Sequence, residues 1–201
     1  MTTISPGIDH FSKTCAELGI TADLGAAVPT PPKEVLGHPL DPALAKFYRA
    51  HDGGWWSSAQ FSLRIYPLKG PDALEWRNTS IRRGADEAAP YPFDKLLIFA
   101  QYGRQAAYLA AVTGEKVGEE QPVIYLDTAE EPWALPIASS IDGAFGLIGD
   151  HLHAAAAQGS INELAFPRDI PELVARDASL RTAARNGRFE GLTDSGEENA
   201  D

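Results

Sequence analysis

Three apolar runs of strand length lie close together between residues 95 and 127. They cover residues 96–100, 106–112 and 123–126. Runs of this length, rich in β-branched and aromatic side chains and bounded by glycine, proline and aspartate, are typical of strands buried on at least one face. The link between the first two runs is short and contains Gly103, which favours a hairpin. We therefore expect these two strands to be antiparallel neighbours at the centre of a sheet.

Two weaker patterns extend this sheet. Residues 61–66 alternate apolar and polar side chains, as a strand with one solvated face does, and Pro67 ends the pattern. Residues 134–138 form a last strand, which we place at an edge because Pro136 cannot donate to a β ladder. The sequence thus predicts an α+β fold, with a mixed or mostly antiparallel sheet of about five to six strands flanked by helices.

Apolar residues at three- and four-residue spacing predict helices on both sides of these strands. Helices are expected over residues 8–18, 41–52, 72–78, 141–157 and 171–186. Asp41 is placed to cap the second helix, with Pro42 at its first position. Ser139 or Ser140 can cap the fourth, and glycines follow the first, second and fourth helices as stop signals.

The chain divides into four predicted regions. Residues 1–35 hold a helix and a proline-rich linker, and residues 36–157 form the α+β domain. Residues 158–192 add a helical extension, and residues 193–201 form an acidic tail that we expect to be disordered.

Composition and charge narrow the possible partners. A hydrophobic content of 44% with 22% charged residues is ordinary for a globular protein. The formal net charge of -11 argues against nucleic acid as a partner and favours a basic protein. Cys15 is the single cysteine, so no internal disulfide is possible, and we expect it to be a small buried side chain. Because no signal-like or membrane-spanning apolar run is found, we expect no membrane contact and a cytoplasmic location.

Few residues suggest chemistry. His151 and His153 are two positions apart, so on a helix they point away from each other and cannot bind one metal ion together. His51 beside Asp52 lies at a helix end, where a histidine can donate to free carbonyl groups. The chain contains no nucleophile elbow, phosphate-binding loop or dinucleotide motif. The sequence therefore predicts no catalytic residue, no metal site and no cofactor.

Several of these segments together resemble the SUKH superfamily, which includes fungal cell-wall synthesis regulators and many bacterial immunity proteins. The similarity is carried by the capped helix at 41–54, the strand and hairpin after residue 98, the strand at 122–125 and the helix start at 139–145. In that family the first helix ends in an Asn-Gly-Gly-like turn. Here the turn reads His51-Asp52-Gly53-Gly54, with aspartate in place of the usual asparagine. The resemblance covers about residues 36–153.

The resemblance implies an α+β fold and a role as an antitoxin that binds a cognate toxin, often a nuclease or another secreted effector. Interface hot spots favour aromatic side chains, and acidic residues suit a basic partner. The partner-binding residues predicted on this ground are Trp55, Trp56, Glu119, Glu120, Asp127, Glu130, Glu131 and Trp133. Adjacent indoles in an extended chain point to opposite faces, so we expect one of Trp55 and Trp56 to be buried. The alternative for all these residues is that the indoles close the core and the acids are merely solvated.

Two other functions are compatible with the sequence. One is a non-enzymatic regulatory or scaffold module with several weak protein partners, for which the acidic tail and the helix at 171–186 would be docking elements. The other is an enzyme, whose activity would have to depend on His51 or on His151 and His153.

Overall fold

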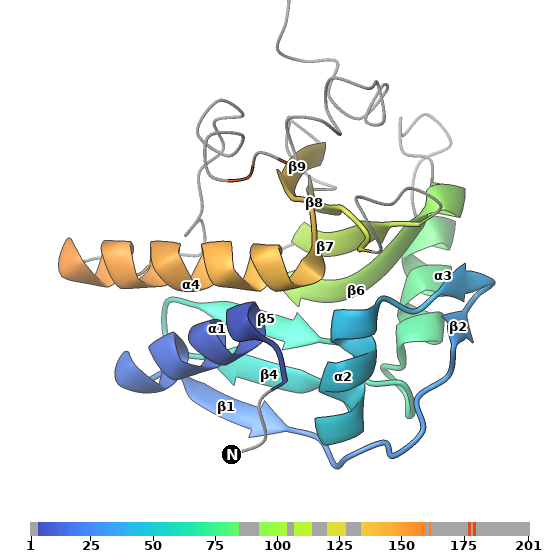
Figure 1. Ribbon diagram of the computed structural model, residues 1–201, viewed down its shortest axis with the longest axis horizontal. Coiled ribbons are helices and arrows are strands. Elements are labelled where there is room, and N and C mark those ends of the chain that lie inside the picture. Colours follow the sequence, from blue (N-terminus) through green and yellow to red (C-terminus); the bar gives the residue numbers. More distant parts are fainter. Residues whose placement is uncertain are drawn as a thin grey trace, which may run out of the picture.

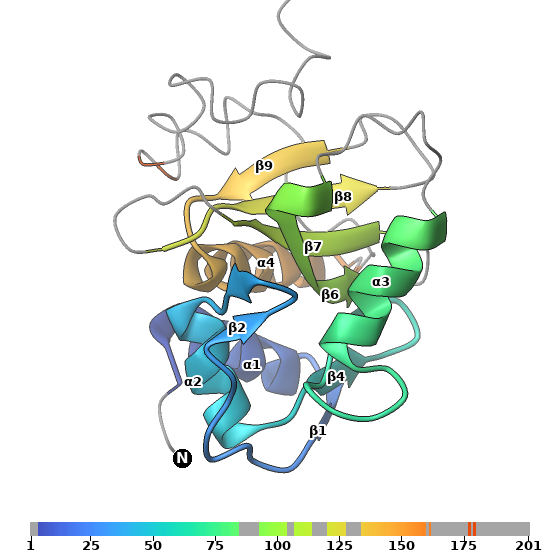
Figure 2. The same cartoon turned by 90° about the vertical axis from the view of Figure 1, so that its right-hand side faces the viewer.

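The computed structural model describes residues 4–84, 93–103, 107–113, 120–127, 134–159, 161, 177 and 179. Its centre is a seven-stranded sheet in the order β1-β4-β5-β6-β7-β8-β9, in which every neighbouring pair is antiparallel (Figures 1 and 2). The strands are β1 (Thr21–Leu24), β4 (Gly54–Ser57), β5 (Ser62–Ile65), β6 (Leu96–Tyr102), β7 (Ala107–Val112), β8 (Val123–Asp127) and β9 (Ala134–Ala138). The predicted α+β class and antiparallel sheet are confirmed.

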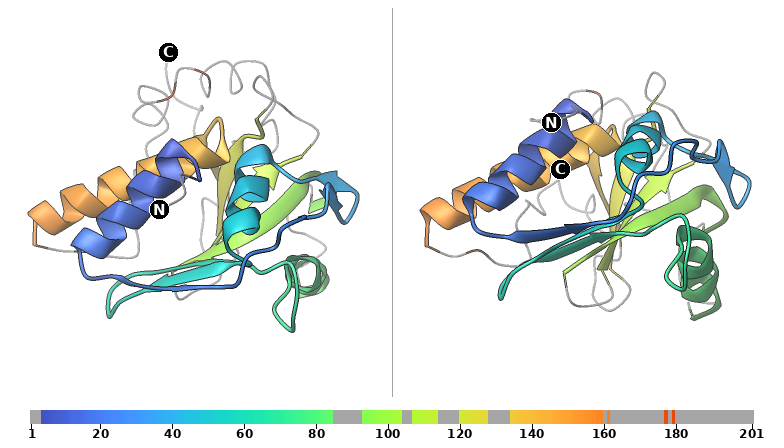
Figure 3. Two further views of the ribbon diagram at one scale, coloured as in Figure 1. Left: turned by 60° about the horizontal axis from the view of Figure 1, so that its bottom comes forward. Right: turned by 90° about the horizontal axis from the view of Figure 1, so that it is seen from below.

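Four helices and a small hairpin complete the described fold. The helices are α1 (Pro6–Glu17), α2 (Pro42–Ala50), α3 (Leu74–Gly84) and α4 (Ile141–Ala157), with a short 3-10 turn, η1 (Phe93–Lys95), before β6. The hairpin pairs β2 (Glu34–Val35) with β3 (His38–Pro39). Figure 3 shows α1, α2 and α4 on one side of the sheet, which we call the inner face, and α3 on the other side, the outer face.

Aromatic side chains fill the space between the inner face and the helices. Phe11 of α1 contacts Trp56 of β4 and Phe145 of α4, with ring centroids 5.2 and 5.4 Å apart. Phe99 of β6 lies 6.4 Å from the Phe145 ring. All of these rings are at most 1% exposed. One core therefore joins the first helix, the sheet and the last described helix.

The predicted boundary near residue 35 does not separate two folding units. Helix α1 packs directly on α4, where the Asp142 carboxylate accepts hydrogen bonds from the Gly7 and Ile8 amides at 2.7 and 3.2 Å. β1 is an edge strand of the main sheet. Cys15 of α1 is 1% exposed, as predicted, and burial raises the pKa of its thiol to about 12. The segment before residue 35 thus contributes to the same core as the rest.

The proline-rich segment 21–39, most of which was predicted to be a linker, contains three strands that sequence reasoning missed. All four residues of β1 are exposed, so they show no buried alternation, and β2 and β3 are two residues long. With β1 and β4 added, the strand predicted at 61–66, β5, is third in the order of the sheet. The sheet therefore has seven strands, one or two more than expected. The two strands that were not expected, β1 and β4, are recognised only by their pairing partners.

The predicted N-terminal caps of α2 and α4 are confirmed. The Asp41 carboxylate accepts from the Ala43 amide at 2.7 Å, and the Ser140 hydroxyl accepts from the Gly143 amide at 3.0 Å. α2 ends at Ala50, earlier than the Gly53-Gly54 pair, and Gly53 with φ 79° turns the chain into β4. β9 is an edge strand, as Pro136 requires. The helix predicted at 171–186 and the tail at 193–201 lie outside the described residues.

α3 begins at Leu74, two residues later than expected, and ends at Gly84, six residues beyond the expected end at residue 78. Asn78, which is fully buried, is one of the residues that tie α3 to the sheet. The Asn78 side-chain amide donates to the Ile98 carbonyl at 2.8 Å, and its oxygen accepts from the Ile98 amide at 2.9 Å. Ile98 stands beside the irregularity where β6 shifts register against β7, so Asn78 supplies a hydrogen-bonding partner there.

Candidate interaction surface

A row of polar and aromatic residues crosses the outer face of the sheet. Asp23, Trp55, Arg64, Gln101 and Tyr108 are consecutive cross-strand partners from β1 to β7. Direct partners in a β ladder point to the same face. On the strand with the two indoles, Trp55 belongs to this outer row and Trp56 to the buried inner face. The outer row is therefore the solvated side of these five strands.

Helix α3 and the loop before it add charged side chains to this row. Arg64 donates to the Asp72 carboxylate at 2.8 Å, and Arg77 of α3 forms an ion pair with the other oxygen of the same carboxylate. The Arg77 guanidinium also lies over two rings, 5.2 Å from the Trp76 centroid and 5.6 Å from the Tyr66 centroid. One carboxylate thus holds two arginines in place between aromatic side chains. We call the set Trp55, Arg64, Asp72, Trp76, Arg77 and Tyr108 the aromatic–arginine surface.

The ionisation of this surface follows from these contacts. The hydrogen bond from Arg64, more than any other contact, lowers the pKa of Asp72, so the carboxylate stays ionised. Burial raises the pKa of Tyr66 and of Tyr108, so both phenols stay protonated. The surface therefore presents two guanidinium groups, one carboxylate and neutral aromatic rings.

Both exposed indoles of the described chain belong to the aromatic–arginine surface. Trp55 is 48% exposed and Trp76 is 52% exposed, and Leu24, at 39%, is the other large hydrophobic side chain that stands out in the described residues. Trp and Arg are the residue types most enriched in interface hot spots. Leu74 occupies the core side of α3, and Trp76, two positions later on the helix, points about 200° away from it towards solvent.

The structure places the predicted partner-binding residues in different surroundings. Trp56 is 1% exposed, so Trp55 alone of that pair faces solvent, as the alternation predicted. Asp127 is not an exposed loop acid: it ends β8, is 8% exposed and accepts from the Tyr125 hydroxyl at 3.3 Å. Glu120 is exposed three residues before β8, a strand that β5, β6 and β7 separate from β4. Glu119, Glu130, Glu131 and Trp133 lie outside the described residues.

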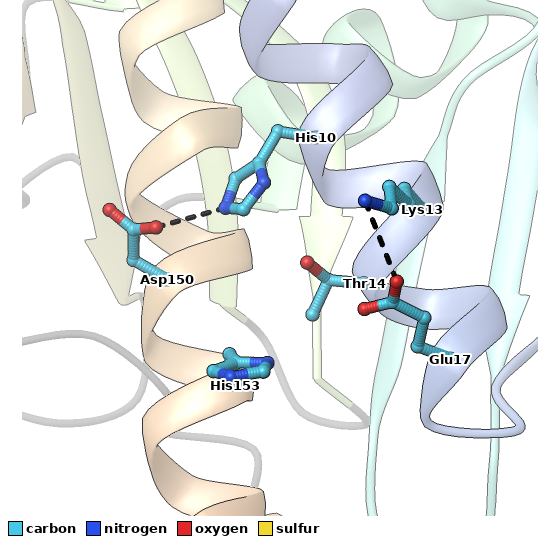
Figure 4. Close-up of a pocket in the computed structure, with 6 residues that line it drawn as sticks. All are labelled: His10, Lys13, Thr14, Glu17, Asp150 and His153. Carbon is cyan, nitrogen blue, oxygen red and sulfur yellow. Dashed lines mark hydrogen bonds and ion pairs between the residues drawn. The ribbon is translucent and has the colours of Figure 1, made fainter.

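A shallow depression of about 270 Å³ lies between α1 and α4 (Figure 4). His10 and Asp150 face each other across it at 2.9 Å, and Lys13 pairs with Glu17 at 3.7 Å along α1. His153 lines the same depression from α4. His10 and Asp150 are 44% and 60% exposed, so this hydrogen bond lies at the surface. Within the described ranges, no three His, Cys, Asp or Glu side chains are grouped to hold a metal ion.

The histidines considered for chemistry have structural surroundings. The His51 ring packs against Phe47 at 5.8 Å, at the end of α2. His151 is half-buried whereas His153 is exposed, in keeping with their predicted divergence on α4.

His38 in the small hairpin holds the hairpin to the main sheet. Thr113 Oγ1 donates to the Lys95 carbonyl at 2.9 Å, so it accepts from His38 Nδ1 at 2.7 Å. His38 Nε2 is then left to accept from Arg82 at 3.3 Å, which requires a neutral ring. Burial, followed by the charge of Arg82, lowers the pKa of His38.

This arrangement predicts a pH dependence of stability. Because the folded state disfavours the protonated ring, the contribution of His38 is fully present above its usual pKa of 6.5 and is lost as the pH falls below that value towards the lower folded pKa. Urea midpoints measured at about pH 7.5 and 5.5 should differ more in the wild type than in His38→Gln. Equal pH dependence in the two proteins would contradict this arrangement.

Comparison with known proteins does not assign the chain to a family. No protein-family model, no curated protein and no solved structure matches the chain. In the part of the chain that the structure describes, no helix is long and apolar enough to cross a membrane. The aromatic–arginine surface on the outer face of the sheet is therefore the feature of the described structure that indicates a function.

Proposed function

We propose that this protein is a cytoplasmic immunity protein, an antitoxin that binds a cognate bacterial toxin and blocks it by occlusion. The observation that carries the proposal is the pair of half-exposed indoles, Trp55 and Trp76, on one side of the sheet. The ion-paired Arg64 and Arg77 stand with them. The similarity of residues 36–153 to the SUKH superfamily gives the class of partner, a nuclease or another secreted effector.

Physical considerations support a binding role for this surface. An indole that is half exposed leaves apolar area in water, and burying it against a partner removes that area. Asp72 already restrains Arg64 and Arg77, so less side-chain entropy is lost when the guanidinium groups pack against a partner. Together, the two guanidinium groups and the Asp72 carboxylate give the aromatic–arginine surface charges of both signs, which suits a partner with acidic and basic side chains at the contact. The overall charge of -11 favours a partner that is basic as a whole, because long-range attraction speeds the encounter.

The test begins with the gene that neighbours this one. Co-expression of its product in a bacterial host should arrest growth, and this protein should restore growth and co-purify with that product. The proposal fails if the neighbouring product is not toxic and no stable complex forms. If neutralisation requires residues 160–201 while residues 1–159 bind nothing, a scaffold that docks through its C-terminal part becomes the better description.

Trp55→Ala and Trp76→Ala are each expected to weaken binding of the toxin at least about tenfold, since a hot-spot residue contributes more than about 1.4 kcal/mol. The dissociation constant can be measured by titration calorimetry. Because both side chains are half exposed, the melting temperatures should stay close to that of the wild type.

Lys13→Ala is the matched control, since Lys13 is 75% exposed on α1, across the sheet from the aromatic–arginine surface. It should bind as the wild type does. If both tryptophan variants also bind as the wild type, the toxin contacts a different part of the molecule.

A further inference from the structure

The outer edge of β1 has backbone groups that no described residue pairs. The Gly25 amide donates to the Gly53 carbonyl at 3.2 Å, and hydrogen-bonded pairs alternate along an antiparallel ladder. The same alternation holds further across the sheet, where the Gly103 amide donates to the Ser62 carbonyl at 2.7 Å. It directs the amide and carbonyl of Asp23 towards β4. The amides and carbonyls of Ala22 and Leu24 therefore point away from the sheet.

This edge is also open to solvent and has apolar side chains beside it. All four residues of β1 are exposed, and β1 stands at the end of the sheet opposite β9 (Figure 2). Leu24, 39% exposed, belongs to the inner face, where it lies over Gly54. Trp55, 48% exposed, belongs to the outer face, next to Asp23. An added strand would thus find an apolar contact on each face.

The charge of Asp23 selects between possible occupants. A second copy of β1, added antiparallel, can bond to the outward amides and carbonyls of both Ala22 and Leu24 only when Ala22 pairs with Leu24 of the other copy. That register sets the two Asp23 side chains directly opposite each other, and like charges in that position are destabilising. A lysine or arginine opposite Asp23 would instead be attracted to it. Its long side chain would extend towards the indole of Trp55.

We infer that β1 accepts an extended segment of the partner protein as an eighth strand, with a basic residue opposite Asp23 and apolar residues opposite Ala22 and Leu24. Main-chain hydrogen bonds hold the segment, and the alternating side chains select it. This inference rests on the proposed function, because it names the part of the toxin that is captured. It also places that segment beside Trp55, at one border of the aromatic–arginine surface.

The test uses capped five-residue peptides of alternating valine and lysine, or valine and glutamate, titrated into the 15N-labelled full-length protein. The valine–lysine peptide should shift the amide signals of Ala22 and Leu24 and the indole signal of Trp55. It should bind at least tenfold more tightly than the valine–glutamate peptide. In Asp23→Lys the preference should reverse. Methylating the backbone amide nitrogens of the valines, which face β1, should abolish binding. Methylating the backbone amide nitrogens of the lysines, which face away from β1, should not.

Ala22→Pro supplies a second variant, because it removes an outward amide without breaking a bond to β4, and it should lose the peptide while remaining folded. Equal binding of both peptides, shifts that miss β1, or self-association of the protein through β1 would overturn the inference. If the peptides fail but the toxin is still captured, the proposed function stands and only the edge is wrong. If the peptides bind at β1 but no neighbouring product is neutralised, the proposed function fails and the edge serves another basic partner.

Discussion

Gly7→Ala is expected to lower the free energy of unfolding by about 3 kcal/mol or more. A Cβ at this position would lie 1.9 Å from the Asp142 carbonyl oxygen and 2.8 Å from its carbon, and both are backbone atoms that no side-chain rotation can move. The helices would have to separate, so the Asp142 carboxylate would also lose the Gly7 and Ile8 amides that it caps. Urea unfolding followed by circular dichroism measures the loss.

Gly146→Ala is the matched control on the facing helix. A Cβ there would lie 3.8 Å from the Gly7 Cα, an ordinary van der Waals distance. Because alanine is the better helix former, this substitution should be neutral or stabilise the protein by up to about 1 kcal/mol. A Gly7→Ala protein that unfolds at the urea concentration of the wild type would show that α1 and α4 do not approach this closely.

Asn78→Leu is expected to destabilise the protein by about 3 kcal/mol, although leucine is close to asparagine in size. The side chain of Asn78 bonds both the amide and the carbonyl of Ile98, and its amide also donates to the Leu74 carbonyl at 2.8 Å. Leucine would leave the two groups of Ile98 buried without these partners, and each unsatisfied group costs about 1–3 kcal/mol. The same urea experiment measures the change.

Thr79→Ala is a control on the neighbouring residue of α3. The Thr79 hydroxyl donates to the Glu75 carbonyl at 2.9 Å, a bond made near solvent, so its loss should change stability by less than about 0.5 kcal/mol. If Asn78→Leu is equally mild, the bonds to Ile98 do not hold α3 on the sheet. Because α3 carries Trp76 and Arg77, a destabilised α3 should weaken toxin binding as well.

Buried apolar runs and helix caps were readable from the sequence because their signals are local. The runs that became β6, β7 and β8 contain residues that are almost all fully buried, so each run shows its character without reference to a partner. Asp41 and Ser140 cap helices through amides two or three residues away. Pro136 excludes a central position by its own chemistry, wherever the rest of the chain lies.

The candidate site was predicted only in part. Trp55 was identified, because alternation along a strand sends adjacent side chains to opposite faces. The charged part of the surface was missed, namely Arg64, Asp72 and Arg77. Arg64 lies eight residues before Asp72 and Arg77 five residues after it, and no local pattern shows that both will share its carboxylate. Asp127 was misplaced because its position at the end of a strand, and not its residue type, determines its burial.

The class of the fold, the antiparallel centre of the sheet and the caps at Asp41 and Ser140 could be predicted from the sequence, since each depends on residues that are close together in the chain. Tertiary structure alone decided that α1 and β1 belong to the same body as the sheet. β1 has no buried residue to reveal it, and α1 is fixed by a carboxylate 135 positions away in the chain, on Asp142. The tertiary structure also places the exposed Trp55 and Trp76 beside the paired Arg64 and Arg77. This surface forms only when α3 packs on the outer face of the sheet.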